Sequence, residues 1–286
     1  MRERLRIAIP NKGRLLDSTL ALLHDAGLVF EANDRSLVAR VQNHPLDILF
    51  VRTNDVVEFV ADGVAEVGIT GGDILAESGV PLPRLKDLGF GRCRLTAAVA
   101  ADAPYEGIGD LAGVRVATSH PNVTRRFFAD QGIPVDVITL SGAVEVAPRL
   151  GLADAIVDLV STGSTLQMNG LRAIGDILAS EAILVANPVA CEQSAAELDG
   201  IVTMLGSVIA ARGRKYLMMN APAVRLEELE GLLPGLESPS VIPLVHKGMI
   251  AIHSVVGADE VWGLLPRLKA AGASGILVLP IEKILP

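Results

Sequence analysis

Four hydroxyl side chains surround one glycine in residues 155–166, AIVDLVSTGSTL. The apolar start of this segment predicts a strand, and the polar run after it leads into a helical pattern. A glycine-containing turn that enters a helix presents several backbone N–H groups and the positive end of the helix dipole, which suit a phosphate dianion. The segment therefore predicts a phosphate-binding loop, which consists of Ser161, Thr162, Gly163, Ser164 and Thr165.

Two further residues sharpen this interpretation. Gly163 would let the backbone approach the anion closely because it carries no Cβ. Asp158 would not touch the phosphate, since like charges repel, but its carboxylate could accept hydrogen bonds from the hydroxyl groups of a phosphorylated sugar. The alternative is an ordinary helix N-cap, for which a single Ser or Thr is enough. We favour the phosphate loop because the segment offers four hydroxyl groups.

A second candidate site is the turn PNKGRL at residues 10–15, which follows a short apolar run. Ligands of open α/β sheets gather where the strands end. Lys12 and Arg14 flank Gly13, so two cations could face a polyphosphate from one turn. The alternative is that both are solvated loop charges.

The composition predicts the class of fold that positions these groups. The chain has 286 residues, and half are hydrophobic but only 3% are aromatic. Its core must therefore be built from Val, Ile, Leu and Ala, as in a buried, mostly parallel sheet of an α/β protein. The net charge of −8 argues against broad nucleic-acid binding. We recognise no export signal and no apolar run of about 18 residues, so we expect a cytoplasmic protein.

Short β-type runs alternate with helical patterns from Leu5 to about Val160, which predicts βα units. The alternation restarts near Arg94, so we expect two lobes with the ligand cleft between them. Residues 213–286 follow the order β-α-β-β-α-β, which is typical of a ferredoxin-like domain. The predicted boundaries are 1–93 with 186–212 for lobe I, 94–185 for lobe II and 213–286 for the last domain.

Several segments in the same order along the whole chain resemble the ATP phosphoribosyltransferase family in its long form. The match at the phosphate loop extends back through GAVEVAPRLGLAD, and the ending GASGILVLPIEKIL fits the regulated long form. The other matching segments are IAIPNKGRL, VGITGGDIL, LGFGRCRL, VATSHPN, KYLMMNAP and PGLESPSVIPL.

The resemblance implies a periplasmic-binding-protein-like catalytic part in which N1 of the ATP adenine attacks C1 of phosphoribosyl pyrophosphate. It also implies a requirement for Mg²⁺, feedback inhibition by histidine through the last domain, and a homo-oligomer, a hexamer in similar enzymes. By resemblance, the turn at Lys12, Gly13 and Arg14 belongs to the nucleotide and pyrophosphate region. No covalent nucleophile or general base is identified.

Two carboxylates at predicted helix starts complete the expected site. Asp73 follows a Gly-Gly pair, where it is either a helix cap or within reach of substrate hydroxyl groups or the adenine amino group. Glu145 precedes the phosphate loop, where it either complements a helix dipole or holds ribose hydroxyl groups or water on Mg²⁺. Sequence does not separate these alternatives.

The predicted histidine pocket lies in Pro234 to Leu244 and in the turn from Gly272 to Gly275, by resemblance alone. We expect its contacts to be Ser238, Ser240 and Ala273.

Other polar residues have weaker signals. Arg125 and Arg126 lie in the first turns of a predicted helix, where they oppose the dipole and either meet an anionic substrate or form an interface salt bridge. The histidines lack metal-ligand spacing, so a structural role is favoured for His120, His246 and His253. Cys93 and Cys191 have neither CxxC spacing nor a flanking histidine, which argues against a metal site or a disulfide.

A non-catalytic interpretation remains. A two-lobed α/β protein could bind a small anion or an amino acid without chemistry, as transport receptors do. The lack of a recognised export signal and the carboxylate beside the phosphate loop both favour an enzyme. A purely regulatory module would not require two substrate lobes.

Overall fold

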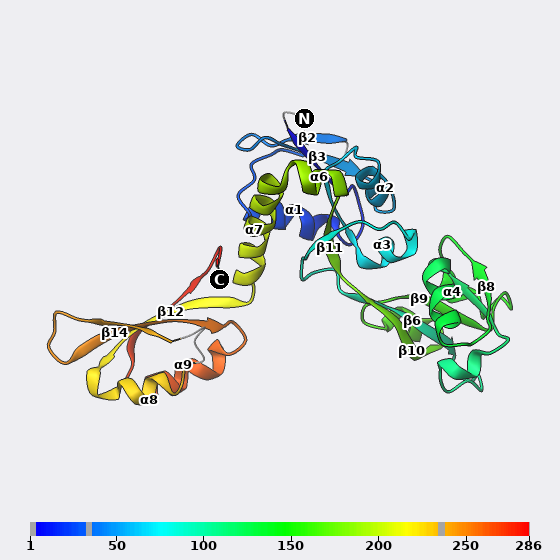
Figure 1. Cartoon of the computed structure of the whole chain (residues 1–286). Helices are drawn as coiled ribbons and strands as arrows, with labels where there is room; N and C mark the ends of the chain where they lie inside the picture. Colours follow the sequence, from blue (N-terminus) through cyan, green and yellow to red (C-terminus); the bar gives the residue numbers. More distant parts are fainter. Residues whose placement is uncertain (1–3, 33–35, 234–237, 286) are drawn as a thin grey trace. The chain divides into compact units, whose positions relative to one another are not determined.

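The computed structural model describes residues 4–32, 36–233 and 238–285 (Figure 1). The chain forms two compact units, Met1–Val202 and Thr203–Pro286. The first unit holds two sheets and the second holds one. The protein is therefore mixed α/β, as its composition predicts.

Lobe I is built on a six-stranded sheet. In it β1 runs parallel to β3 and β4, whereas β11 runs antiparallel to β4 and β5. Branched aliphatic side chains of its central strands are fully buried, as expected of strands that are covered on both faces. In sheet order the strands are β2 (Val38–Arg40), β3 (Leu46–Val51), β1 (Leu5–Pro10), β4 (Val67–Gly71), β11 (Ala182–Ala186) and β5 (Arg84–Asp87). The helices are α1 (Leu16–Asp25), α2 (Asp55–Ala61) and α3 (Gly72–Ser78).

Lobe II is built on a five-stranded sheet. Here β7 runs parallel to β8 and β9, while β6 runs antiparallel to β9 and β10. In sheet order the strands are β10 (Leu171–Ser180), β6 (Cys93–Ala100), β9 (Ala155–Val160), β7 (Arg115–Thr118) and β8 (Asp136–Thr139). The helices are α4 (Pro121–Asp130) and α5 (Ser164–Met168), with the 3-10 turns η1 (Ile108–Leu111) and η2 (Val144–Val146).

The chain crosses between the lobes twice, between β5 and β6 and again between β10 and β11. Two α/β sheets joined by two crossings form the expected two-lobed, periplasmic-binding-protein-like architecture. The return crossing was predicted at residue 186, but β11 begins at Ala182 and already pairs with lobe I. The boundary therefore lies between Ser180 and Ala182.

Strand β10 was not predicted from the sequence. Its register against β6 shifts twice, between Ala173 and Gly175 and between Asp176 and Leu178. Such irregularities interrupt the alternation of apolar and polar residues by which a strand is recognised.

After β11 the chain forms two helices, α6 (Pro188–Gln193) and α7 (Ala195–Ala211). The Asn187 side chain accepts hydrogen bonds from the N–H groups of Val189 and Ala190, and Pro188 occupies the first helical position. Asn followed by Pro is a strong helix start, so this helical region begins at Pro188.

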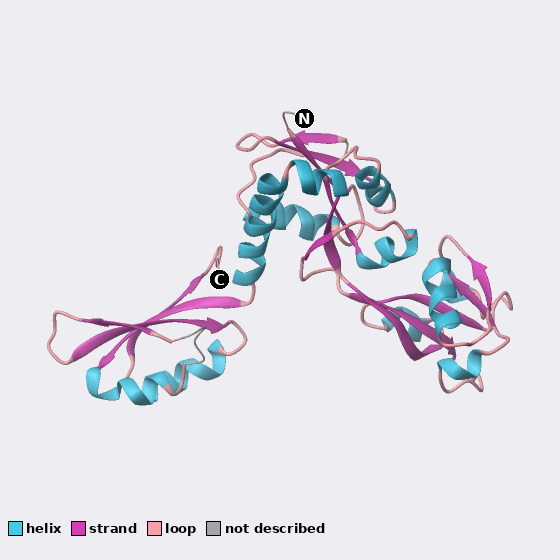
Figure 2. Ribbon diagram, viewed as in Figure 1, coloured by secondary structure: helices cyan, strands magenta, loops and turns pink. Residues whose placement is uncertain are grey.

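The second unit contains an antiparallel ferredoxin-like sheet, as predicted. Its strand order is β13 (Ser240–Pro243), β14 (Met249–Gly257), β12 (Arg214–Pro222) and β15 (Ser274–Pro280). The turn η3 (Ala223–Arg225) and the helices α8 (Leu226–Glu230) and α9 (Val261–Ala270) cover one face of this sheet (Figure 2). Leu217, Met219, Ile252 and Leu268 form the centre of the core between them.

Within the described ranges, no helix is both long enough and apolar enough to cross a lipid bilayer.

Candidate active site

The predicted phosphate loop has the expected strand–turn–helix geometry. Strand β9 ends at Val160 and α5 begins at Ser164, with Gly163 in the left-handed conformation at φ 81°. The Thr162 and Ser164 hydroxyl oxygens lie 3.0 Å apart. All four hydroxyl-bearing residues of the loop are exposed, whereas Leu166 is buried and anchors the short helix. The hydroxyl groups are therefore open to an incoming ligand.

A cavity of about 450 Å³ adjoins this loop. Thr162 and Gly163 line it together with Arg94 and Arg172. The Arg94 guanidinium is half exposed and lies 2.9 Å from a carboxylate oxygen of Asp176. Both guanidinium groups already have partners within the protein, since Arg94 pairs with Asp176, which also lines the cavity, and Arg172 donates hydrogen bonds to the carbonyls of Ala103 and Tyr105.

Asp158, on β9, is partly buried in lobe II. Burial raises the pKa of its carboxyl group, and repulsion by Glu145 raises it further. The Leu159 N–H, whose nitrogen lies 2.8 Å from Oδ1, and the attraction of His120 act in the opposite direction. Asp158 and Glu145 are thus close enough to interact, and perturbed carboxyl groups of this kind concentrate at functional sites.

Glu145 lies in the 3-10 turn η2 rather than at the start of a helix, which corrects our expectation. A three-residue turn has little dipole to complement, so the helix-dipole explanation loses its basis. Ala143, the N-cap of this turn and two residues before Glu145, has φ 51° and is the one non-glycine residue with positive φ in the part of the chain that the structure describes. Backbone strain of this kind clusters at functional sites.

Asp73 lies in the first turn of α3 and is 1% exposed. It is not the N-cap, since Gly71 occupies that position. The Ser180 hydroxyl accepts a hydrogen bond from the Asp73 N–H at 2.9 Å and donates one to Oδ1 at 2.6 Å. Burial raises the pKa of Asp73, but hydrogen bonds from His120 and Ser180 and the charge of Arg14 together bring it below its usual value. The carboxylate is held ionised.

The turn after β1 presents its cations to solvent. Lys12, Gly13 and Arg14 are all exposed, and Gly13 has φ 88°. The Arg14 guanidinium donates a hydrogen bond to the Gly91 carbonyl at 3.2 Å and lies 3.7 Å from Asp73 Oδ1. The structure therefore brings Arg14 and Asp73 together.

Sequence reasoning assigned His120 a structural role and missed its position. It is 5% exposed, and its Nε2 lies 3.5 Å from Oδ2 of Asp73 in the other lobe. It also attracts the charge of Asp158. His120 thus links the Arg14–Asp73 pair of lobe I to the Asp158–Glu145 pair of lobe II. The signal for it was its position just after a parallel strand, β7, where ligand groups gather.

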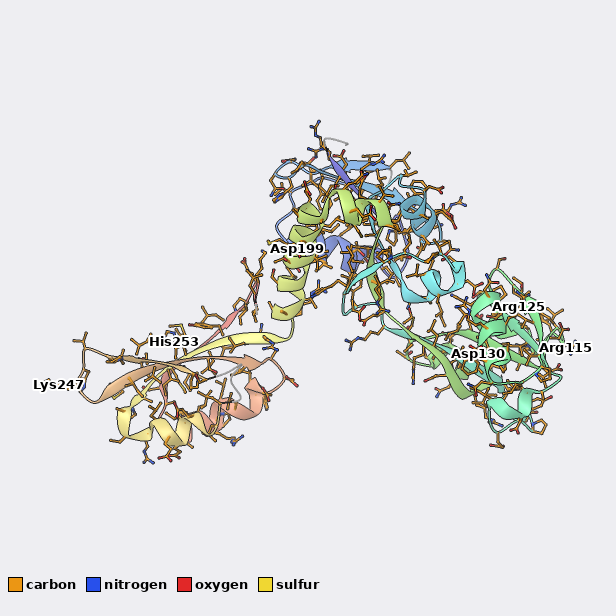
Figure 3. All side chains as sticks on the ribbon, in the orientation of Figure 1. Arg115, Arg125, Asp130, Asp199, Lys247 and His253 are labelled. Atoms are coloured by element: carbon orange, nitrogen blue, oxygen red, sulfur yellow. The ribbon has the colours of Figure 1, made fainter. Side chains whose placement is uncertain are left out.

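The remaining candidates lie elsewhere. Arg125 and Arg126 are exposed on α4, where Figure 3 labels Arg125. Cys93 is buried, Cys191 is partly buried, and both are free thiols. Among the described residues, no group of three or more His, Cys, Asp or Glu could hold a metal ion.

The three predicted histidine contacts do not converge within one chain. Ser240 begins β13 and Ala273 precedes β15, and these are the two edge strands of the sheet. With β14 and β12 between them, the edges are about 14 Å apart at the usual strand spacing. Ser240 and Ser238 are exposed, whereas Ala273 is buried in the core. Residues 234–237 of the predicted pocket lie outside the described part of the chain.

The fold and these contacts define a class of two-lobed α/β proteins whose ligand groups come from the strand ends of both lobes. A family model described as ATP phosphoribosyltransferase matches residues 52–207, and one described as HisG, C-terminal domain, matches residues 211–283. The chain therefore belongs to the ATP phosphoribosyltransferase family, in its long form.

Individual relatives agree with this assignment. The ATP phosphoribosyltransferase of Gemmatimonas aurantiaca is 48% identical over 292 residues, which cover 99% of this chain and 100% of the relative. That of Methanosarcina acetivorans is 43% identical over 289 residues, with the same coverage. A solved structure, the ATP phosphoribosyl transferase (HisG:HisZ) complex from Thermotoga maritima, aligns with a TM-score of 0.63 and 32% identity, covering 72% of this chain and 98% of that chain.

The chain is therefore an enzyme of the first step of histidine biosynthesis, and a binding protein without catalysis is not favoured. Enzymes of this family require a divalent metal ion.

Proposed function

We propose that this chain joins C1 of phosphoribosyl pyrophosphate to N1 of the ATP adenine, releasing pyrophosphate and forming N1-(5-phosphoribosyl)-ATP. The observation that carries the residue assignments is the contact between Asp73 and His120, in which Asp73 Oδ2 lies 3.5 Å from His120 Nε2. It connects a cationic turn in lobe I with a pair of carboxylates beside a phosphate loop in lobe II. Each lobe would hold one substrate.

In lobe II, residues 161–165 bind the 5-phosphate through backbone N–H and hydroxyl groups. Asp158 and Glu145 accept hydrogen bonds from the ribose hydroxyl groups. The raised pKa of Asp158, due first to its burial, means that its charged form is poorly solvated in the free protein. Donors from the sugar would offset that cost.

In lobe I, Lys12, Gly13 and Arg14 bind the phosphates of ATP and the departing pyrophosphate. Asp73 is 1% exposed and already engaged by Ser180, so its part is to orient Arg14 rather than to contact adenine. Hydrogen bonds and the Arg14 charge lower the pKa of Asp73 against the effect of burial, so Asp73 stays ionised as the partner of Arg14.

The reaction is a single displacement that inverts C1. The N1 lone pair forms the new bond while the bond from C1 to the pyrophosphate oxygen breaks and its electron pair leaves with pyrophosphate. N1 carries no proton to remove, so the step requires no general base. The protein contributes by placing the two substrates within attack distance and by stabilising the charge that develops on pyrophosphate.

We assign Mg²⁺ as the divalent ion. Mg²⁺ prefers oxygen ligands, keeps several waters, and is often bound through substrate phosphates and one or two carboxylates. Asp158 and Glu145 form such a pair, and their mutual repulsion fits a nearby cation. When bound, the ion would neutralise the pyrophosphate leaving group.

We also propose that histidine inhibits the enzyme through the ferredoxin-like domain, with Ser238, Ser240 and Ala273 as contacts. Since Ser240 and Ala273 lie at opposite edges of the sheet, one pocket can include both only if edges of different copies meet. The proposal therefore requires a homo-oligomer, such as a hexamer. A coupling of about 1–3 kcal/mol between the sites would suffice. If added histidine changes neither the turnover nor the substrate affinity of the protein, the proposed inhibition is contradicted.

The transfer reaction is tested by incubating the protein with ATP, phosphoribosyl pyrophosphate and Mg²⁺. We expect pyrophosphate release together with the change in ultraviolet absorbance that accompanies alkylation of adenine at N1. Omission of ATP should abolish both signals. Pyrophosphate release that does not depend on ATP would contradict the proposed function.

A further inference from the structure

The two lobes also meet at a place that no substrate assignment includes. Glu77, near the end of α3 in lobe I, reaches the first turn of α4 in lobe II. Its Oε1 accepts a hydrogen bond from the Asn122 N–H and its Oε2 accepts one from the Val123 N–H, each at 2.9 Å. The Asn122 side chain returns a hydrogen bond to the Glu77 carbonyl at 3.0 Å. Three hydrogen bonds therefore join the lobes here.

These contacts complete the start of α4. The first backbone N–H groups of a helix lack partners within the helix, and His120, the N-cap, makes no side-chain cap. Pro121 has no N–H, and the Thr124 N–H is bonded to the His120 carbonyl. The two donors left, on Asn122 and Val123, are those that Glu77 satisfies across the lobe boundary. A carboxylate at this position also complements the helix dipole.

Glu77 and Asp73 are four residues apart on α3, so they lie on the same face of the helix. Asp73 contacts His120 at the N-cap of α4, and Glu77 contacts the two N–H groups that follow. One face of α3 therefore docks on the start of α4. Because Asp73 is also held by Arg14 and Ser180, α3 links the turn after β1 to lobe II.

We infer that Glu77 is a positioning residue for phosphoribosyl transfer, which fixes the orientation of lobe II against lobe I. This inference rests on the proposed function. Glu77 touches neither proposed substrate site, so it acts through the lobes that carry them. A displacement of about 1 Å between two reacting groups can lower a rate about 100-fold. Loss of the three hydrogen bonds between Glu77 and the start of α4 should therefore lower kcat more than it lowers the affinity for either substrate.

The first test separates rate from affinity in Glu77→Ala and Glu77→Gln. We expect kcat to fall about tenfold in Glu77→Ala and less in Glu77→Gln, which keeps one acceptor oxygen, while the Kd of each substrate alone changes less than about twofold. The matched control is Glu58→Gln, an exposed glutamate on α2 of the same lobe, which should behave as wild type. An unchanged kcat in Glu77→Ala, or a loss of phosphoribosyl pyrophosphate affinity as large as the loss of kcat, would overturn the inference.

The second test does not depend on activity. Spin labels at Asp62→Cys in lobe I and Gln131→Cys in lobe II, both exposed positions, report the distance between the lobes when Cys191 is replaced by Ser. We expect Glu77→Ala, and also Asn122→Ala, to broaden the distance distribution. If the variants keep a distribution as narrow as that of the labelled protein without them, Glu77 does not fix the orientation of the lobes and the inference is refuted. If the distribution broadens but the wild-type protein has no transferase activity, only the proposed function is refuted. Should Glu77→Ala fail to fold, Glu77→Gln and Asn122→Ala give the same two readouts.

Discussion

Oδ2 of Asp73 lies 3.5 Å from Nε2 of His120, and both side chains are almost fully buried. Asp73 comes from lobe I and His120 from lobe II, so this pair connects the two sheets of the first unit. Burial alone would raise the pKa of Asp73, yet His120, Ser180 and Arg14 lower it. The contact is therefore electrostatic as well as steric, and a substitution at Asp73 tests whether its charge helps to hold the two lobes together.

The first prediction concerns Asp73→Asn and pH. A carboxyl group whose pKa is lowered on folding stabilises the protein above the ordinary value of 3.8, and this contribution is lost as the pH falls through the folded pKa. We expect the substitution to cost about 1–3 kcal/mol of unfolding free energy at neutral pH, with a smaller difference below about pH 4. Urea denaturation at both pH values measures it.

The control for this experiment is Asp102→Asn, an exposed aspartate of lobe II, which should change stability little at either pH. A cost for Asp73→Asn that is the same at both pH values would show that its ionisation is not involved.

The second prediction separates activity from stability at Asp158. Its pKa is raised, first by burial and then by Glu145, so the ionised carboxylate destabilises the folded state at neutral pH and the cost is relieved on acidification. Asp158→Asn should therefore unfold at the same temperature as wild type or higher, with a gain below about 1 kcal/mol. Activity should fall about 100-fold or more because a ribose contact is lost.

Thermal unfolding and steady-state kinetics of the same preparation test this prediction. Full activity would disprove the ribose-binding role, and a marked loss of stability would disprove the electrostatic account.

The third prediction concerns Gly163, whose φ of 81° favours glycine. A Cβ there would approach only Val160 Cγ1, at 4.0 Å, so alanine fits sterically within the protein. Gly163→Ala should cost about 1 kcal/mol for the left-handed backbone and should also weaken binding of phosphoribosyl pyrophosphate, because the methyl group enters the phosphate loop.

Gly151→Ala is the matched control, since Gly151 has φ 70° and open space around its Cβ position. It should cost similar stability and leave binding unchanged, as measured by isothermal titration calorimetry. Equal affinities for the two variants would argue against a phosphate at residues 161–165.

The sequence predicted the parts of the structure in which local chemistry and spacing agree. The strand–turn–helix around Gly163 and the ferredoxin-like order of the last domain follow from hydrophobic periodicity and turn residues, and both are confirmed. The roles of the site residues stay predictions. Periodicity was less informative for β10, where two register shifts hide the strand, and at Ala182, where the chain returns to lobe I sooner than predicted.

Long-range contacts were beyond sequence reasoning. His120 looked like a core histidine because Asp73, 47 positions away, gave no local sign that it would lie opposite. Glu77 was likewise indistinguishable from a surface charge until α3 and α4 were placed together. Such pairs depend on the packing of two lobes rather than on the residues around each one.

The fourth prediction concerns the lobe I turn. Arg14→Gln should raise the KM for ATP about tenfold, since it removes a charge from the proposed phosphate contact, and should weaken binding of phosphoribosyl pyrophosphate by less, through its pyrophosphate group alone. Arg40→Gln, at an exposed arginine of β2, is the control and should leave both constants as in wild type. A larger effect on phosphoribosyl pyrophosphate than on ATP would assign the turn to the other substrate.

The central claim is that a bond forms between C1 of the sugar and N1 of adenine. The most direct measurement uses phosphoribosyl pyrophosphate labelled with ¹³C at C1 and ATP labelled with ¹⁵N at N1, followed by nuclear magnetic resonance during turnover with Mg²⁺. Our account predicts a one-bond coupling between the two labels in the product, with release of pyrophosphate. A ¹³C signal that moves to free ribose 5-phosphate, or a product in which the ¹⁵N label stays uncoupled, would contradict it.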